Sequence, residues 1–137
     1  MKAAALIVAS TVGLYISIYF TLIYYSFISP ASKLVPEVCR VEESTCRSVL
    51  SHRDARILGI PNSLVGAMYY MLVLIVAIVH PAQEVLSWVM YASWATVVVS
   101  IYLVYSLLFV VRTPCLLCFV SHGLNLLLAI LLTMKVL

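Results

Sequence analysis

The sequence predicts an all-α membrane protein, a four-transmembrane-helix bundle with a short amphipathic helix in the loop after the first helix. Of its 137 residues 65% are hydrophobic and only 9% are charged, whereas a soluble domain usually carries about 25% charged residues. The apolar residues gather in four stretches without charge, each long enough for the roughly 20 residues that cross a bilayer as a helix. This composition excludes a soluble enzyme, a nucleic-acid-binding module and a secreted disulfide scaffold.

The four spans and their connections make residues 1–137 a single membrane domain. The predicted spans are residues 3–29, 63–79, 85–111 and 114–134. Because four spans return the chain to its starting side, both termini and the turn His80–Glu84 are expected at one membrane surface. The opposite surface receives the turn Arg112–Thr113 and the segment 30–62, named here the cysteine loop, which holds four of the five acidic residues and two of the four cysteines.

A short amphipathic helix is predicted inside the cysteine loop. Ser44 or Thr45 can cap its N-terminus, and it is expected to run to about Arg56. One face of this helix carries Cys46, Val49, Leu50 and Arg53, at spacings of i, i+3, i+4 and i+7. Such a helix would lie flat over the mouth of the bundle, unless the loop is solvated and has no fixed structure. The apolar but broken residues 57–61 predict a return into the membrane interface.

The cysteines fall in two pairs on the same side of the membrane. Cys39 and Cys46 lie in the cysteine loop with six residues between them. Cys115 and Cys118 enclose two leucines at the start of the fourth span. Cys115 would occupy the first helical turn, where unpaired backbone N–H groups and the positive end of the helix dipole favour a thiolate. Cys118 follows at i+3 on the same face, close enough for a disulfide and one turn deeper in the apolar zone.

This layout predicts thiol–disulfide exchange along a relay. A pair in an exposed loop can reach a protein partner, and a pair at the membrane surface can pass electrons to an acceptor dissolved in the bilayer. A thiolate of one pair would attack the disulfide of the other, and the second cysteine would resolve the mixed disulfide. Other interpretations stay open: cysteines buried as small hydrophobic residues, structural disulfides in a non-catalytic four-span scaffold, and a metal site such as zinc with four cysteine ligands.

Polar side chains in the spans indicate where the acceptor would bind. His122 and Asn125 follow Cys118 at i+4 and i+7, on one face of the fourth helix. A histidine in a membrane is costly unless it faces the bundle interior or water, which favours function for His122, whereas Asn125 could equally join helices by hydrogen bonds. Asn62 could cap the second span or donate to a ligand carbonyl, and position alone slightly favours the cap. Tyr70 could line a cavity for a flat ligand beside the expected apolar walls Val49, Leu50, Val65, Tyr69, Leu103 and Leu107.

The cysteine pairs and their surroundings resemble the vitamin K epoxide reductase family, in the form of a prokaryotic homologue. The likeness runs from about residue 38 to residue 128. It is carried by Cys39 and Cys46 with the following Val49-Leu50-Ser51, by Pro61-Asn62-Ser63 with Gly66 one turn on, and by Cys115-Leu116-Leu117-Cys118. The resemblance implies a four-helix bundle around a quinone, such as menaquinone or ubiquinone.

The resemblance also implies an electron path and a role for each site residue. Electrons would pass from a thioredoxin-like protein to Cys39 and Cys46, then to the second pair, then to the quinone, so that disulfides are generated. By motif position Cys46 would attack Cys115, and Cys118 would be the thiol facing the quinone. Asn62 would donate a hydrogen bond to a quinone oxygen, which overturns the preference for a cap.

Two positions depart from the family pattern. A second serine usually follows the loop cysteines, whereas here Ser51 is followed by His52. The position four residues beyond the last cysteine, a tyrosine in the animal enzymes, is His122, and we expect its imidazole to donate to the second quinone oxygen. Because the sequence carries no fused thioredoxin domain, the redox partner is expected to be a separate chain. Membrane lipid is the other expected partner, and nucleic acid is not expected.

The two membrane surfaces carry unequal numbers of Lys and Arg residues. Six lie on the cysteine side and two on the side of the termini, namely Lys33, Arg40, Arg47, Arg53, Arg56 and Arg112 against Lys2 and Lys135. Short loops rich in Lys and Arg usually stay in the cytoplasm, which predicts a multi-pass protein of the cell membrane with a cytoplasmic cysteine loop. The bacterial relatives implied by the resemblance place their cysteines on the outer side, and in that case the arginines would serve the active site.

Overall fold

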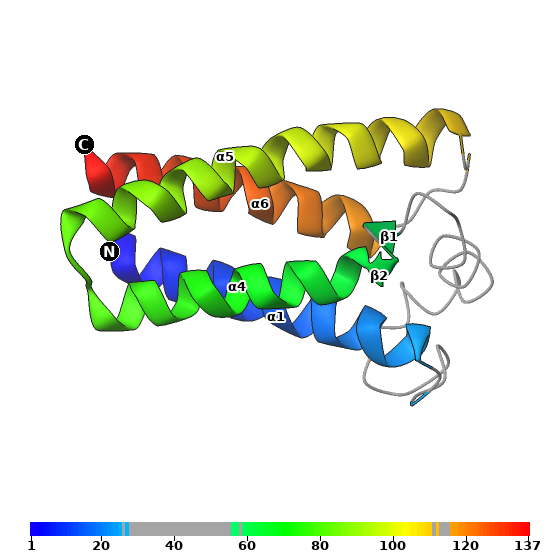
Figure 1. Cartoon of the computed structure of the whole chain (residues 1–137), viewed down its shortest axis with the longest axis horizontal. Helices are drawn as coiled ribbons and strands as arrows, with labels where there is room; N and C mark the ends of the chain where they lie inside the picture. Colours follow the sequence, from blue (N-terminus) through cyan, green and yellow to red (C-terminus); the bar gives the residue numbers. More distant parts are fainter. Residues whose placement is uncertain (26, 28–55, 58, 111, 113–115) are drawn as a thin grey trace.

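The computed structural model describes residues 1–25, 27, 56–57, 59–110, 112 and 116–137. Within these residues four helices lie side by side as a bundle (Figure 1). They are α1, Lys2–Tyr24; α4, Asn62–Val79; α5, Gln83–Tyr105, which continues into the π-helical turn η2, Ser106–Val110; and α6, Leu116–Val136. Each of the four spans, with α5 and η2 taken as one, is long and apolar enough to cross a membrane. The predicted all-α four-helix membrane bundle is therefore confirmed.

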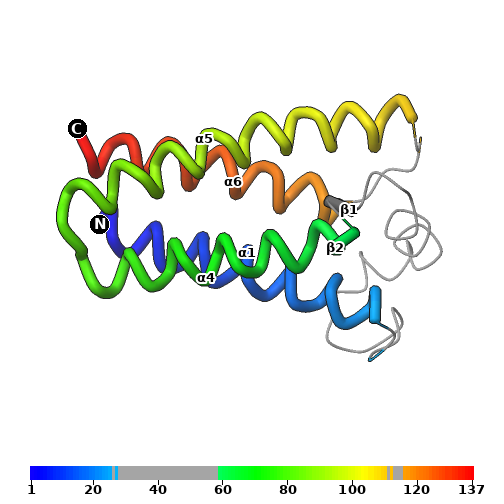
Figure 2. The backbone as a smooth tube through the Cα atoms, viewed as in Figure 1, coloured from blue at the N-terminus to red at the C-terminus, as the bar shows by residue number. Residues whose placement is uncertain are grey.

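The two ends of the bundle differ in what they hold. Both chain termini lie at the same end as the turn between α4 and α5, here called the terminal end, and the short strands lie at the opposite end, the loop end (Figure 2). The helix α4 stops at His80, which adopts a left-handed φ of 51° and whose backbone N–H donates to the carbonyl of Val76 at 3.2 Å. Because Pro81 follows, a helical conformation at residue 80 is disfavoured.

Side chains close the terminal end around the last turn of α6. The final carbonyl groups of a helix have no hydrogen-bond donors within the helix. At the end of α6, two residues of other helices supply such donors. Lys2 Nζ donates to the carbonyl of Met134 at 3.1 Å, and Gln83 Nε2 donates to the carbonyl of Val136 at 2.6 Å. The end of α6 is thereby tied to the first turns of α1 and α5.

A tight hairpin precedes α4 at the loop end. Its strands, β1 (Arg56–Ile57) and β2 (Ile60–Pro61), pair antiparallel, and Gly59 between them has a φ of 82°, a left-handed value that glycine adopts without steric penalty. This corrects the prediction of a broken return into the interface over residues 57–61. The amphipathic helix predicted from Ser44 or Thr45 lies outside the described residues, except that Arg56, its expected last residue, is in a strand because it pairs with Pro61.

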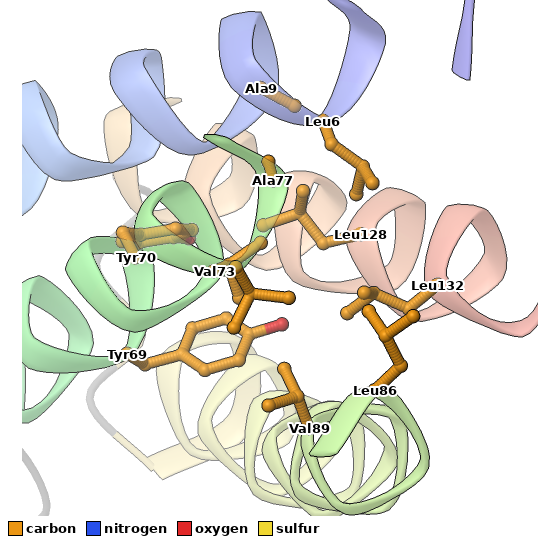
Figure 3. Packing of buried hydrophobic residues seen from close by; sticks show 11 residues of the cluster. Leu6, Ala9, Tyr69, Tyr70, Val73, Ala77, Leu86, Val89, Leu128 and Leu132 are labelled. Atoms are coloured by element: carbon orange, nitrogen blue, oxygen red, sulfur yellow. The ribbon is translucent and has the colours of Figure 1, made fainter. Parts of the chain in front are cut away.

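Among the described residues, buried apolar side chains form two clusters. The helix α1 packs along both α4 and α6, and α5 packs along α6, while α4 and α5 stand further apart (Figure 1). The larger cluster, shown in Figure 3, contains Leu6, Ala9, Tyr69, Tyr70, Val73, Val76, Ala77, Leu86, Val89, Leu128 and Leu132. The second, here called the loop-end cluster, contains Ile16, Tyr19, Phe20, Ile23 and Leu107.

Small residues allow α1 and α4 to approach closely. A Cβ atom added at Gly13 would collide with the ring of Tyr70, and one added at Gly66 would lie 3.1 Å from the hydroxyl of Ser17. Within a membrane, apolar side chains gain little by leaving lipid for protein, because both surroundings are apolar. Helices therefore associate through close packing, which small residues at the interface allow. The glycines therefore fix how near α4 lies to α1.

Candidate functional site

The first turns of α6 carry the residues predicted to face the electron acceptor. Cys118 and His122 are both half-buried and lie about one helical turn apart. Cys118 packs against the loop-end cluster, which includes Leu107 of η2. The Cys118 side chain therefore packs among apolar side chains, a setting that suits a membrane-soluble acceptor.

The imidazole of His122 has an unsatisfied nitrogen. Its Nδ1 atom is buried and has no hydrogen-bond partner within the part of the chain that the structure describes. Buried polar atoms are nearly always hydrogen-bonded, so an exception requires an explanation. Because leaving such an atom unpaired costs about 1–3 kcal/mol, a ligand that accepts from this nitrogen or donates to it would be favoured here.

Asn62 begins α4 at the loop end but does not cap it. The capping position is Pro61, whose ψ of 135° is extended, and no side chain of the described residues caps this helix. Asn62 is therefore the first helical residue, with a half-buried side chain. Its amide is not used as a cap, and a role as hydrogen-bond donor to a ligand stays a prediction from the sequence.

The neighbour of Asn62 is attached to α1. The hydroxyl groups of Ser63 and Thr21 are hydrogen-bonded at 3.0 Å, and Thr21 Oγ1 also donates to the carbonyl of Ser17 at 2.7 Å. Because Thr21 has one hydroxyl proton and gives it to that carbonyl, Ser63 is the donor in the contact between the two helices. The first turn of α4, and with it Asn62, is thereby held against α1.

The described residues among the expected apolar walls lie in different surroundings. Leu107 is buried in the loop-end cluster, against which Cys118 packs, whereas Leu103 is half-buried and Val65 is 37% exposed. Tyr69 is buried in the larger cluster shown in Figure 3. Its hydroxyl donates to Ser93 Oγ of α5 at 2.9 Å, so this side chain bridges the gap between α4 and α5.

A partly buried hydrogen-bond network, which the sequence did not predict, joins α4, α5 and α6. Asn125 of α6 contacts the hydroxyl groups of both Tyr70 on α4 and Ser100 on α5. The sequence left Asn125 between two roles, and these contacts are those of a residue that joins helices. Tyr70, which by its position could line a cavity, is only 2% exposed in the structure. A signal was present in α5, where the buried Ser93 and Ser100 stand seven residues apart on one face.

The other predicted site residues lie outside the described residues. These are Cys39, Cys46, Val49, Leu50 and Cys115. Of the proposed relay, the structure therefore locates Cys118. The spatial relation between the two cysteine pairs stays a prediction from the sequence.

The comparison with known families covers nearly the whole chain. The sequence model described as the Vitamin K epoxide reductase family matches residues 4–133. The match includes all four spans, the cysteine loop, and the positions of Asn62 and His122. The chain therefore belongs to the vitamin K epoxide reductase family, and its general class is that of the membrane thiol–disulfide oxidoreductases.

Proposed function

We propose that this protein takes electrons from a thioredoxin-like protein through its two cysteine pairs, passes them to a membrane quinone, and so generates disulfides. The observation that carries the proposal is the arrangement on α6. There a half-buried Cys118 packs against apolar side chains, and the next turn holds His122, whose buried Nδ1 atom has no hydrogen-bond partner among the described residues. A cysteine, a buried polar atom that can hydrogen-bond a ligand and an apolar surrounding are the elements that reduction of a quinone requires.

The proposed exchange is balanced in electrons and protons. The partner's dithiol reduces the disulfide between Cys39 and Cys46 and leaves as a disulfide. The Cys46 thiolate then attacks the sulfur of Cys115, which releases Cys118 as a thiolate, and Cys39 resolves the mixed disulfide by attacking Cys46. The inner pair, now a dithiol, gives two electrons and two protons to the quinone, which leaves as the quinol while the inner disulfide forms again.

Two polar residues from different helices would orient the quinone ring. Asn62 at the start of α4 and His122 on α6 would each hydrogen-bond one quinone oxygen. Both side chains are half-buried, and neither the amide of Asn62 nor Nδ1 of His122 has a capping or pairing role within the described residues. The apolar part of the ring would lie against Leu107 and neighbouring side chains of the loop-end cluster.

Purified protein in detergent, with a dithiol or a reduced thioredoxin-like protein as donor and a short-chain quinone as acceptor, tests the proposal. Cys118→Ala should abolish quinone reduction with either donor. Cys46→Ala should abolish it with the protein donor only, because a small dithiol can reduce the inner pair directly. Gly123→Ala, at an exposed position of α6, serves as the matched control and should retain activity. Undiminished quinone reduction by Cys118→Ala would contradict the proposal.

The order of the relay is tested by trapping. When Cys39 is replaced by alanine, the mixed disulfide between Cys46 and Cys115 cannot be resolved, so it should accumulate and be visible on non-reducing gels. Thiol trapping of the unmodified protein should show both pairs changing redox state with a dithiol and then with a quinone. Cysteines that never change state would indicate a scaffold with structural disulfides, and stoichiometric metal in the purified protein would indicate a metal site.

A further inference from the structure

We propose, on the basis of the function proposed above, that Tyr70 and Asn125 are positioning residues of the quinone site. They hold α4 and α6 in register and thereby set the separation of Asn62 and His122. Neither Tyr70 nor Asn125 would contact the quinone itself. Their effect would be exerted through the two helices that carry the quinone-binding side chains.

The hydroxyl of Tyr70 connects α4 to α6 inside the bundle. It lies 2.6 Å from Asn125 Oδ1 and 3.0 Å from the backbone carbonyl of Ser121. Both of these oxygen atoms are acceptors, so the single hydroxyl proton is shared between them, and the contact with Asn125 is the shorter. Tyr70 is only 2% exposed, so water does not compete for this proton.

The network reaches the other two helices as well. Asn125 Nδ2 donates to Ser100 Oγ on α5 at 2.8 Å, and Ser100 is itself buried. On the opposite side the ring of Tyr70 covers Gly13 of α1 so closely that an added Cβ atom would overlap the ring. The side chain of Tyr70 therefore contacts α1 and α6 directly, and it is linked to α5 through Asn125.

The two contacts that Tyr70 makes with α6 lie on either side of His122, the residue proposed to bind the quinone. Ser121 immediately precedes His122, and Asn125 follows it by three residues, so Tyr70 holds the helical turn that carries His122. On α4, Tyr70 lies eight residues beyond Asn62, about 12 Å along the axis. A shift of α6 along its axis by the rise of a single residue would move His122 by about 1.5 Å, which is enough to misplace its hydrogen bond to the quinone.

The test compares three conservative variants by steady-state kinetics with a short-chain quinone. Tyr70→Phe removes only the hydroxyl, and Asn125→Leu removes the amide at nearly constant size. Thr133→Val is the matched control, because it removes the hydrogen bond that Thr133 receives from Trp94 Nε1 at 3.0 Å. That bond also joins α5 to α6, but it lies three turns beyond His122 on α6.

We expect Tyr70→Phe and Asn125→Leu each to raise the KM for quinone about tenfold, the loss that follows when one hydrogen bond to a ligand is misplaced, with a smaller change in kcat. Reduction of the inner disulfide by a dithiol, measured without quinone, should stay unchanged. The double variant should raise KM no further than the larger single effect, because both residues act through one network. Thr133→Val should leave KM unchanged.

Two results would overturn the assignment. One is a KM for Tyr70→Phe and Asn125→Leu equal to that of the unmodified protein. The other is an equal rise in KM for Thr133→Val, which would show that any lost contact between helices has the same effect. The unmodified protein is therefore measured first. If it reduces no quinone at all, the proposed function is wrong, and the variants do not bear on the positioning role.

Discussion

At the scale of single residues, the two polar groups assigned to the quinone come from different helices and can be removed independently. Asn62 is the first residue of α4, and His122 lies in the second turn of α6. Losing one hydrogen bond to a buried carbonyl costs about 1–3 kcal/mol. We therefore expect Asn62→Ala to lower kcat/KM for quinone about tenfold or more, measured by steady-state quinone reduction, while reduction of the inner disulfide by a dithiol is unchanged.

A pair of variants at His122 separates the loss of a hydrogen bond from the loss of volume. His122→Phe keeps an aromatic ring but has no polar atom. His122→Tyr introduces the residue that the resemblance gives for the animal enzymes, and its hydroxyl supplies a hydrogen-bond donor. We expect His122→Phe to lose about tenfold in kcat/KM for quinone and His122→Tyr to retain most of it. If both variants match the unmodified protein, His122 does not contact the quinone and its buried nitrogen has another explanation.

At the scale of elements, the close approach of α1 and α4 depends on a missing side chain. An alanine at position 13 would place a Cβ atom against the ring of Tyr70, and such overpacking costs about 1–3 kcal/mol. At Gly123 on α6 the space around an added Cβ atom is open, and alanine is the better helix former by about 1 kcal/mol. Gly13→Ala should therefore lower the midpoint of thermal unfolding in detergent, and Gly123→Ala should leave it equal or higher. Equal midpoints for both variants would show that the ring of Tyr70 can move aside.

The elements also show which features a sequence can predict. About 20 apolar residues without charge predict a span reliably, because a membrane admits few structures other than a helix. Apolar length does not fix where a helix ends, since α1 stops at Tyr24 although its charge-free stretch continues to Ser29. Nor does it reveal the widening of the last turn of α5 into η2, or the hairpin that Gly59 allows.

The candidate site was predictable to a similar extent. Periodicity places Cys118, His122 and Asn125 on one face of α6, because helical spacing alone determines a face. It does not identify the neighbouring helix, because that depends on how the spans pack. Asn125 is hydrogen-bonded to Tyr70 and Ser100, and only the folded bundle shows these two partners.

At the scale of the whole molecule, the two ends of the bundle carry different charge. Lys2 lies in the first turn of α1 and Lys135 in the last turn of α6, at the terminal end, whereas Arg56 in β1 and Arg112, which follows η2, belong to the loop end. Counted over the sequence, the division is two against six. An excess of Lys and Arg in short loops marks the cytoplasmic side, so we expect the cysteines to face the cytoplasm. This orientation would be the inverse of the one that the family resemblance implies, and it suits organisms whose intracellular proteins are rich in disulfides.

Labelling with a membrane-impermeant maleimide decides the orientation. After reduction, Cys39 and Cys46 should react in lysed cells but not in intact cells. The control is Glu84→Cys in a variant whose native cysteines are replaced by alanine, since Glu84 lies at the exposed start of α5 at the terminal end and should react in intact cells. If the loop cysteines react from outside and Glu84→Cys does not, the Lys and Arg count is misleading for this protein. The arginines of the cysteine loop would then be explained by their chemistry, because positive charges near a cysteine favour the thiolate and attract an acidic partner.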